Sequence, residues 1–393
     1  MRQNILVINC GSSSIKFSLV DPDAGTHVLT GQAANLGSRE GELTWKGCQQ
    51  GNKALGNIDH NQAMLEIVQL LRDAGEPFIG IGHRVVHGGE HFTGSCLVAD
   101  EPLAALAAHS HLAPLHNPVN LLGIEAARKA FPDLPQAMVF DTAFHQSMPP
   151  RAYLYPIPYH FYTEHGVRRY GFHGTSHRFV TAKAAEMLER PLTDLALVSA
   201  HLGNGCSATA VRGGKSMDTT MGMTPLEGLV MGTRSGDVDP SLHSYLCDTL
   251  NLTLQDVTSI LNKQSGLLGL SGRSNDMRTL LEAADAGDER AAVAVEVFCY
   301  RLAKSVAALI VGLGRLDALI FTGGIGENSP KIRARTLNLL GFLGLKLDET
   351  ANQTPKQAPA GRITTSTAPA AMVVATDEEL LIARDTAKLL SNP

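Results

Sequence analysis

The chain has 393 residues, of which 44% are hydrophobic, and its 33 basic and 38 acidic residues give a net charge of −5. This length exceeds what one hydrophobic core usually supports and therefore predicts two domains. Because the balance is slightly acidic and no basic run occurs, nucleic acid and anionic membranes are not expected as main partners, and a small molecule is favoured.

The cysteines and the apolar stretches limit the class of protein further. Six cysteines occur singly, without a C-x-x-C pair, and indicate neither a zinc ribbon nor a disulfide framework. No apolar stretch approaches the length of a membrane span, and the first residues lead directly into a strand-like run rather than a signal-peptide core. We therefore expect a soluble protein of the cytoplasm.

The first element is a strand, a glycine turn and a second strand over residues 4–21, NILVINCGSSSIKFSLVD, and residues 195–215, LALVSAHLGNGCSATAVRGGK, have the same design. Aligning Gly11 with Gly203 separates the two units by 192 residues (203 − 11 = 192), about half the chain. Glycines let backbone N–H groups approach an anion, so two such turns would suit a polyphosphate. Each unit taken alone could equally be an ordinary hairpin.

A helix over residues 62–74 and a strand over residues 78–82 precede the segment HRVVHGGEHF. The histidines at 83, 87 and 91 recur every fourth residue, which would align metal ligands on a helix, but the valine and glycine pairs between them disfavour a helix. Arg84 follows a buried strand and suits the bidentate grip of a carboxylate or phosphate. A structural salt bridge is the alternative for Arg84.

Helices are expected over residues 103–108 and 119–129, followed by a strand over residues 136–140 that ends at Asp141. Ligands of α/β sheets lie at the carboxyl ends of strands, so Asp141 is a candidate for a metal or a transferring group, with turn capping as the alternative. The proline-rich segment from Met148, MPPRAYLYPIPYHFY, is expected to contain the domain junction.

A helix over residues 177–188 is expected to be capped by Thr175 or Ser176, which leaves His173 outside its N-terminus, where anions are favoured. A core histidine is the alternative. Arg234 lies in the tight loop GTRSGD, which could present its guanidinium to a ligand. That arginine could equally be supported by Asp237 or Asp239 as part of the structure.

Helices over residues 254–262, 277–286 and 290–313 lead to a strand over residues 316–321, the glycine turn TGGIGENS and a helix from Pro330. Strand, glycine turn and helix is an arrangement that binds nucleotides, although this turn has neither a Walker sequence nor a dinucleotide fingerprint. After a strand over residues 372–375, Thr376 and Glu379 form a predicted capping box for the last helix. Glu378 is then available for a cation, with a solvated acid in the first turn of the helix as the alternative.

These candidates share a chemistry. Phosphoryl transfer needs a positioned nucleophile, Mg²⁺ and cations around the developing charge, but little covalent chemistry from the protein. Two loop arginines without an obvious base beside them indicate an acceptor that is already ionised, as a carboxylate is at pH 7. An alcohol acceptor would need a base, which Asp141 could supply.

The motifs NCGSSSIKF, GHRVVHGGE, APLHNP, FDTAFHQ, YGFHGTSH, HLGNGCS, MTPLEGLVMGTRSGDVDP, TGGIGEN and TDEEL closely resemble, in order and spacing, those of the acetate kinase family. The resemblance implies an α/β fold of the actin, Hsp70 and sugar-kinase superfamily, with two duplicated ribonuclease-H-like domains around a central cleft. The domains would comprise residues 1–147 with 379–393 and residues 148–378. A homodimer is also implied.

The resemblance implies reversible transfer of the ATP γ-phosphoryl group to acetate, giving acetyl phosphate and ADP, with Mg²⁺ or alternatively Mn²⁺. Propionate as the preferred acceptor is the alternative, although a valine at 86 leaves less room than the alanine of propionate-preferring relatives. More distant hypotheses are a kinase for butyrate or an alcohol and a non-enzymatic ATP-switched module. Asp377 stands where asparagine is usual in the family.

The resemblance also assigns site residues. The catalytic group would be Asp141, Arg84, His173 and Arg234, and the small acyl pocket would be formed by Arg84, Val86, Leu115 and Pro225. Asn9 and Glu378 would bind the metal ion. Nucleotide binding would involve Ser12, Ser14, Lys16, His201, Leu202, Gly203, Asn204, Gly205, Asp276, Met277, Arg278, Gly324, Ile325, Gly326, Glu327 and Asn328.

Overall fold

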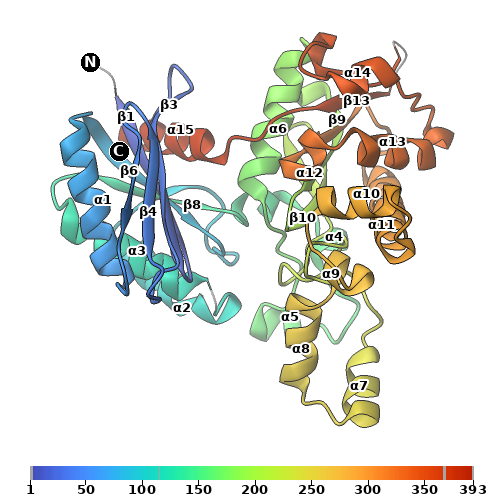
Figure 1. Cartoon of the computed structure of the whole chain (residues 1–393), viewed down its shortest axis with the longest axis horizontal. Coiled ribbons are helices and arrows are strands. Elements are labelled where there is room, and N and C mark those ends of the chain that lie inside the picture. Colours follow the sequence, from blue (N-terminus) through green and yellow to red (C-terminus); the bar gives the residue numbers. More distant parts are fainter. Residues whose placement is uncertain (1–2, 115, 366–368, 392–393) are drawn as a thin grey trace. The chain divides into compact units, whose positions relative to one another are not determined.

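The structure is a computed structural model that describes residues 3–114, 116–365 and 369–391. The chain divides into two compact units, Met1–Gln146 with Asp377–Pro393, the first unit, and Ser147–Thr376, the second unit. The boundaries expected from the sequence, after residues 147 and 378, compare with 146 and 376 here. Each unit is built on one β-sheet with helices packed on it (Figure 1).

The sheet of the first unit has eight strands in the order β5-β4-β3-β2-β1-β6-β8-β7. Strand β1 is antiparallel to β2 and parallel to β6, which is parallel to β8. The strands are β1 Asn4–Gly11, β2 Ser14–Asp21, β3 Thr26–Ala34, β4 Glu42–Gly47, β5 Gly51–Ala54, β6 Phe78–Val85, β7 Cys96–Leu97 and β8 Gln136–Phe140.

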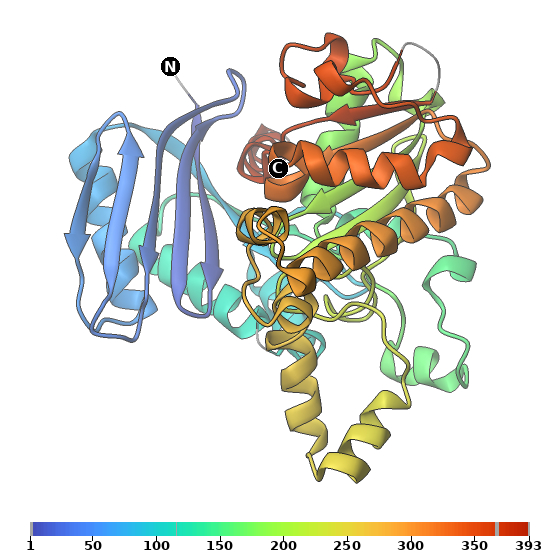
Figure 2. The ribbon, with the colours of Figure 1, turned by 45° about the vertical axis from the view of Figure 1, so that its right-hand side comes forward.

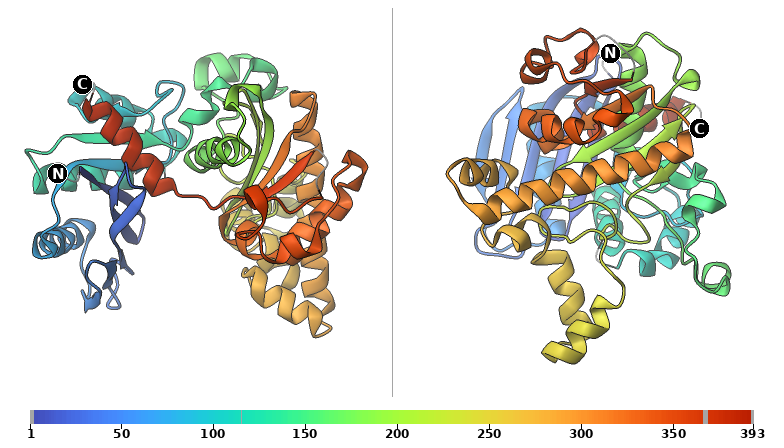
Figure 3. Two further views of the ribbon diagram at one scale, coloured as in Figure 1. Left: turned by 90° about the horizontal axis from the view of Figure 1, so that it is seen from above. Right: turned by 90° about the vertical axis from the view of Figure 1, so that its right-hand side faces the viewer.

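Helices cover both faces of this sheet. They are α1 His60–Ala74, α2 Asp100–Ala108, α3 Asn117–Ala130 and α15 Glu378–Ser391. A core that includes Leu6, Ile8 and Phe17 of the sheet joins Met64 and Ile67 of α1. Helix α15 lies on the other face, away from α1 (Figure 3). Its close approach follows from glycines in β6, because a Cβ atom at position 80 or 82 would meet side chains of α15.

The sheet of the second unit has five strands in the order β11-β10-β9-β12-β13, namely β9 Ala196–Leu202, β10 Cys206–Arg212, β11 Lys215–Thr219, β12 Ala318–Thr322 and β13 Ala370–Val373. Its helices are α4 Pro150–Tyr153, α5 His160–His165, α6 Gly174–Met187, α7 Leu242–Leu250, α8 Leu254–Lys263, α9 Gly266–Ser271, α10 Met277–Asp285, α11 Glu289–Leu313, α12 Gly323–Asn328, α13 Pro330–Leu339 and α14 Glu349–Gln353. The long helix α11, drawn in orange, runs along this sheet (Figure 2). Among the described residues, no helix is both long and apolar enough to cross a membrane.

The two sheets share a topology. The order β3-β2-β1-β6-β8 in the first unit corresponds to β11-β10-β9-β12-β13 in the second. The first three strands of each series are antiparallel neighbours, and the last three are parallel. The repeat predicted from the two glycine hairpins therefore extends over five strands, and the expected α/β class with two duplicated units is confirmed.

Three local predictions were wrong. Helix α6 begins at Gly174 rather than at residue 177, because His173, with φ of 55°, already turns the chain into the helix. The predicted glycine turn after β12 is the short helix α12, whose first N–H, from Gly323, donates to Glu327 Oε1 at 3.0 Å. At α15 the Leu380 N–H donates to Asp377 Oδ1 at 2.9 Å, so Asp377 replaces Thr376 as the capping residue.

Candidate active site

In the first unit, Arg84 and Asp141 meet at the carboxyl ends of β6 and β8. Arg84 Nε lies 3.1 Å from each carboxylate oxygen of Asp141, and Nη2 lies 2.5 Å from Oδ2. The Asp141 side chain is only 2% exposed, whereas that of Arg84 is 24% exposed. A two-point ion pair of this kind fixes the plane of the guanidinium. Asp141 directly follows β8, as predicted.

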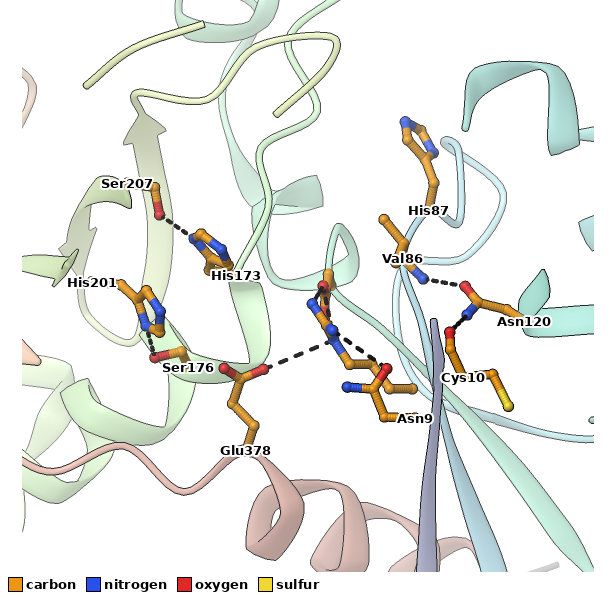
Figure 4. Close-up of polar contacts among 12 residues, drawn as sticks. Asn9, Cys10, Val86, His87, Asn120, His173, Ser176, His201, Ser207 and Glu378 are labelled. Atoms are coloured by element: carbon orange, nitrogen blue, oxygen red, sulfur yellow. Dashed lines mark hydrogen bonds and ion pairs between the residues drawn. The ribbon is translucent and has the colours of Figure 1, made fainter. Parts of the chain in front are cut away.

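Asn9 of β1 and Glu378, the first residue of α15, lie beside the same guanidinium (Figure 4). Arg84 Nη1 is 3.5 Å from Asn9 Oδ1, and Nε is 3.9 Å from Glu378 Oε2. Burial alone would lower the pKa of Arg84, but the charges of Asp141 and Glu378 outweigh burial and raise it above the usual arginine value. The guanidinium therefore stays charged at every physiological pH.

The donor atoms around Arg84 suit a hard divalent cation. Asn9 offers an amide oxygen and Glu378 a carboxylate, and both are oxygen ligands of the kind that Mg²⁺ prefers. The histidines at 83, 87 and 91 are not grouped in this way among the described residues: His83 lies in β6 with Nε2 2.7 Å from Gln136 Oε1. Asp377, at the position where asparagine is usual, accepts a hydrogen bond from His27 Nε2 at 2.9 Å.

The first hairpin turn joins β1 to β2 and presents predicted phosphate ligands near Asn9. Asn9 and Lys16 are directly opposite each other in the antiparallel register. Ser12 and Lys16 are exposed, and Ser14 is partly exposed. An exposed lysine beside a serine-rich turn can bind phosphate, so the positions of these residues are compatible with their predicted role.

In the second unit, His173 belongs to a chain of hydrogen bonds. Its Nδ1 is 2.9 Å from Ser207 Oγ, which is 2.8 Å from His177 Nε2. His177 Nδ1 is in turn 2.7 Å from Ser199 Oγ. The other members of this hydrogen-bond series, Ser207, His177 and Ser199, are fully buried, whereas His173 is partly exposed. The buried serines thus orient the ring of His173 and direct its Nε2 away from the core.

His201 lies in β9, which pairs with the strand β10 that contains Ser207, and its ring stacks on that of His173. The ring centroids are 4.4 Å apart, and the planes are inclined by 27°. His201 Nδ1 is 2.8 Å from Ser176 Oγ (Figure 4). The same hydroxyl is 2.8 Å from Thr376 Oγ1. The second glycine hairpin and the start of α6 are therefore joined through two stacked imidazoles.

Arg234 lies in the irregular loop between β11 and α7 and points toward the same hairpin turn. A Cβ atom added at Gly205 would be 3.4 Å from His173 Nε2 and 3.6 Å from Arg234 Nη1, so both side chains border the space that glycine leaves open. Nη1 donates to Pro225 O at 3.2 Å, and no carboxylate among the described residues pairs with this guanidinium. Burial lowers the pKa of Arg234. An anion would satisfy its remaining donors.

Asn204 ties the turn HLGNG to the Arg234 loop and to Asn275, which precedes the predicted nucleotide residue Asp276. Asn204 O accepts from Gly232 N at 2.9 Å, and its Oδ1 accepts from Asn275 Nδ2 at 3.0 Å. Asp276, the next residue, caps α10 by accepting from Thr279 N at 2.9 Å. The structure thus brings together the hairpin, the Arg234 loop and the start of α10.

Some predicted nucleotide residues are engaged inside the fold. Leu202 and Met277 are buried, so their side chains belong to the core. Glu327 Oε1 accepts from Gly323 N at 3.0 Å and from Thr376 N at 3.2 Å, and this carboxylate therefore holds α12 to the end of the unit. Gly324 and Asn328 are exposed on the same short helix.

The structure describes only some of the residues predicted to form the acyl pocket. Val86 is partly exposed just beyond β6, Pro225 is partly exposed in the Arg234 loop, and Leu115 lies outside the described residues. Sequence reasoning missed Asn120 and Ser207, which hold the segments around Val86 and His173. A buried asparagine on the apolar face of a helix and a serine in a buried strand are the signals that could have revealed them.

Similarity to known proteins shows the family of this chain. The sequence matches the Acetokinase family over residues 4–384. The chain belongs to the acetokinase family. It is 56% identical over 390 residues to the acetate kinase of Ectopseudomonas mendocina, with 99% of both chains covered. It is 54% identical over 394 residues to that of Chromobacterium violaceum, again with 99% of both chains covered.

Solved structures of the acetokinase family superpose closely on this chain. A propionate kinase from Francisella tularensis gives a TM-score of 0.93 at 44% identity and covers 98% of this chain and 100% of that one. The acetate kinase of Porphyromonas gingivalis gives a TM-score of 0.93 at 40% identity and covers 99% of this chain and 100% of that one. The family resemblance recognised in the sequence is therefore confirmed.

Proposed function

We propose that this chain reversibly transfers the γ-phosphoryl group of ATP to acetate. The observation that carries the proposal is the Arg234 guanidinium, which borders the space at Gly205 together with His173 and has no carboxylate partner among the described residues. A partly buried cation without a protein counter-charge suits an anionic ligand. Family membership supports acetate and ATP as the substrates.

The proposed reaction is a direct displacement at phosphorus. A carboxylate oxygen of acetate forms a bond to the γ-phosphorus while the bond from that phosphorus to the β,γ-bridging oxygen breaks, giving acetyl phosphate and ADP. Acetate is already ionised at neutral pH, so no protein base is required. Catalysis then depends on holding the reactants in line and on cations near the phosphoryl oxygens.

Each arginine is proposed to have a distinct role. Among the described residues, Arg84 Nη1 has only a long contact, 3.5 Å, to Asn9 Oδ1, so this nitrogen is proposed to donate to the acetate carboxylate. Asp141 is proposed to act by holding the rest of that guanidinium. Arg234 and the Nε2 of His173 are proposed to bind the phosphoryl group in transit, where each added donor stabilises the developing charge.

Asn9 and Glu378 are proposed to hold Mg²⁺, with Mn²⁺ as an alternative. Their oxygen donors fit this ion, and Lys16 lies opposite Asn9 in the strand register. When bound, the ion would neutralise charge on the phosphate oxygens. Asn9 and Glu378 are already beside Arg84, so the chain itself needs little rearrangement to present them.

The adenosine of the nucleotide is proposed to bind to the second unit, with Ser12, Ser14 and Lys16 of the first unit near the phosphates. The supporting observation is that Asn204 joins the HLGNG turn by hydrogen bonds to Asn275 and to Gly232 of the Arg234 loop. The exposed residues Asp276, Arg278 and Asn328 are proposed to face the adenosine. The buried Leu202 and Met277 would support these contacts from the core.

Acetate is proposed as the preferred acceptor, with propionate as the alternative. Val86, Leu115 and Pro225 stay predictions for the acyl pocket. The similarity to a propionate kinase from Francisella tularensis keeps the alternative open, since one methylene in an apolar pocket contributes only about 1–3 kcal/mol to discrimination. A homodimer and a cytoplasmic location also stay predictions.

The test is a hydroxylamine trap for acyl phosphate. Purified protein with ATP and Mg²⁺ is incubated with acetate, propionate or butyrate, and the hydroxamate is measured by colour. We expect product with acetate at the highest kcat/KM and with propionate at a lower one. A higher kcat/KM with propionate would favour the alternative, and no product with any of the three acids would refute the proposed function.

A further inference from the structure

We propose that Asn120 is a positioning residue. It holds the end of β6, which contains Arg84 and is followed by Val86, against the end of β1, which contains Asn9. This inference rests on the proposed function, because the importance of these residues depends on it. Asn120 belongs to α3 and is 3% exposed, so it does not face solvent. It acts through the backbone of other residues rather than on a substrate.

The two strands separate where the candidate site begins. Parallel pairing of β1 with β6 ends at Ile8 and His83, whereas β6 continues to pair with β8 as far as Val85. Beyond that point the Cys10 carbonyl and the Val86 N–H have no partner across the β1–β6 pair, although Cys10 still lies opposite Ile15 of β2. A buried, unpaired backbone group costs about 1–3 kcal/mol, so a separation of this kind requires a substitute partner.

The Asn120 side chain is that substitute. Its Nδ2 donates to Cys10 O at 3.0 Å, and its Oδ1 accepts from Val86 N at 3.0 Å (Figure 4). A carboxamide carries both a donor and an acceptor, so one side chain can satisfy a carbonyl on one strand and an N–H on the other. The bridge therefore connects the residue after Asn9 with the second residue after Arg84.

Helix α3 is shaped for this contact. Gly123, one turn after Asn120, leaves room for the Cys10 side chain, because a Cβ atom at Gly123 would collide with Cys10 Sγ. Asn117, one turn before, binds both backbone groups of His87: Nδ2 donates to His87 O at 2.8 Å, and His87 N donates to Oδ1 at 3.2 Å. Residues 117, 120 and 123 thus lie along one side of α3 and fix the segment after β6.

The functional consequence follows from the short distances around Arg84. Its Nη1 is 3.5 Å from Asn9 Oδ1, so a shift of β6 relative to β1 changes the spacing between the proposed acetate donor and the proposed metal ligand. A misplacement of about 1 Å can reduce the rate about 100-fold. The effect should be larger in acetate kinetics than in the binding of ATP, because the adenosine is proposed to bind to the second unit.

The experiment compares Asn120→Asp and Asn120→Ala with wild type and with Ile67→Val. Aspartate keeps the acceptor for Val86 N but replaces the donor to Cys10 O, whereas alanine removes both. Ile67 is a fully buried core residue of α1 in the same unit, and it controls for a general loss of packing. For each protein, KM for acetate, KM for ATP and kcat are measured by hydroxamate formation.

We expect kcat/KM for acetate to fall about 10-fold in Asn120→Asp and about 100-fold in Asn120→Ala, whereas KM for ATP stays within about 2-fold of wild type. Ile67→Val should change neither constant by more than about 2-fold. Equal losses for acetate and ATP, or acetate constants in both variants that match Ile67→Val, would overturn the inference. A wild-type protein without product refutes the proposed function itself, and this inference with it.

A rescue experiment tests the geometry without altering Asn120. Gly123→Ala should push Cys10 away from α3 and reduce kcat/KM for acetate, again with KM for ATP preserved. Adding Cys10→Ala removes the sulfur that the new methyl group meets and leaves the carbonyl in place, so the double variant should recover at least half of the lost activity. A double variant no better than Gly123→Ala would contradict the proposed bridge.

Discussion

Arg84 Nη2 lies 2.5 Å from Asp141 Oδ2, while Arg84 Nε lies 3.1 Å from both carboxylate oxygens. The two residues come from the ends of the neighbouring parallel strands β6 and β8. The structural ion pair that was the alternative for Arg84 is therefore present on one side of the guanidinium, while Nη1 on the other side is directed toward Asn9. Binding of acetate by the remaining side of the guanidinium stays a prediction.

Asp141→Asn should therefore lower activity and stability together. The amide keeps the shape of the carboxylate but loses its charge. The guanidinium of Arg84 is then held less firmly, and its positive charge is no longer neutralised by Asp141. We expect kcat to fall at least about 100-fold and the free energy of unfolding to fall by about 2 kcal/mol. Hydroxamate kinetics and urea unfolding measure these quantities. A kcat within about 3-fold of wild type would assign Asp141 to the fold alone.

Arg234→Lys should separate catalysis from stability. Lysine keeps the positive charge but loses the planar fork that binds two oxygens at once. Because no carboxylate among the described residues pairs with Arg234, we expect the free energy of unfolding to change by less than about 1 kcal/mol and kcat to fall about 100-fold. The exposed Arg190, paired with Asp317, provides a control as Arg190→Lys. Wild-type kcat in Arg234→Lys would contradict the assigned role.

Ser207→Ala should disturb His173 more than Ser199→Ala does. Ser207 Oγ contacts both His173 and His177, whereas Ser199 Oγ contacts only His177 of this pair. Both serines are fully buried, so each substitution should cost about 1–3 kcal/mol of stability. We expect kcat to fall about 10-fold in Ser207→Ala and less than about 3-fold in Ser199→Ala. Equal kinetic losses at equal stability would show that Ser207 does not act through His173.

Val86→Ala should shift the choice of acceptor. The smaller side chain leaves room for one more methylene beside Arg84, so the ratio of kcat/KM for propionate to that for acetate should rise about 10-fold. The Val86 N–H would keep its bond to Asn120. Val119→Ala, which removes the same atoms from a partly buried position of α3, is the matched control. An unchanged ratio in Val86→Ala would exclude Val86 from the acyl pocket.

His83 should make the protein less stable in mild acid. Burial lowers the pKa of its imidazole to about 4 from 6.5. Between these values the unfolded chain binds a proton that the folded chain does not. The contribution of His83 to the free energy of unfolding is therefore full above pH 6.5 and falls as the pH decreases toward 4. The full contribution is about 3 kcal/mol. Burial lowers the pKa of His87 to about 3 and acts in the same direction.

The measurement for His83 is urea unfolding at pH 7.5, 6 and 5. His83→Gln removes the titrating group, and we expect the dependence of the unfolding free energy on pH to become flatter by at most about 1.4 kcal/mol per pH unit. The variant should be less stable than wild type at pH 7.5, because the pair with Gln136 is altered. An identical pH dependence in the two proteins would exclude His83 as the source.

Local patterns in the sequence were sufficient for much of the fold. The glycine turns at Gly11 and Gly203 predicted two hairpins and a duplication, because alternating residues and turn glycines express strand geometry over short distances. Asp141 was predicted at a strand end for the same reason. The start of α6 was not, since it depends on the left-handed backbone of His173. The capping of α15 was not either, because Asp377 accepts from Leu380 N, whereas the Thr376 hydroxyl contacts Ser176, 200 residues away.

The class of fold, the repeat, the chemical types of the candidate residues and the family could all be predicted from residue patterns. How these residues pair is visible only in three dimensions: Arg84 pairs with Asp141 across 57 residues, and Asn120 with Cys10 across 110. Such partners are set by the order of strands in a sheet and by which face of a helix packs on it. These arrangements follow from burying the whole core, so no local pattern encodes them.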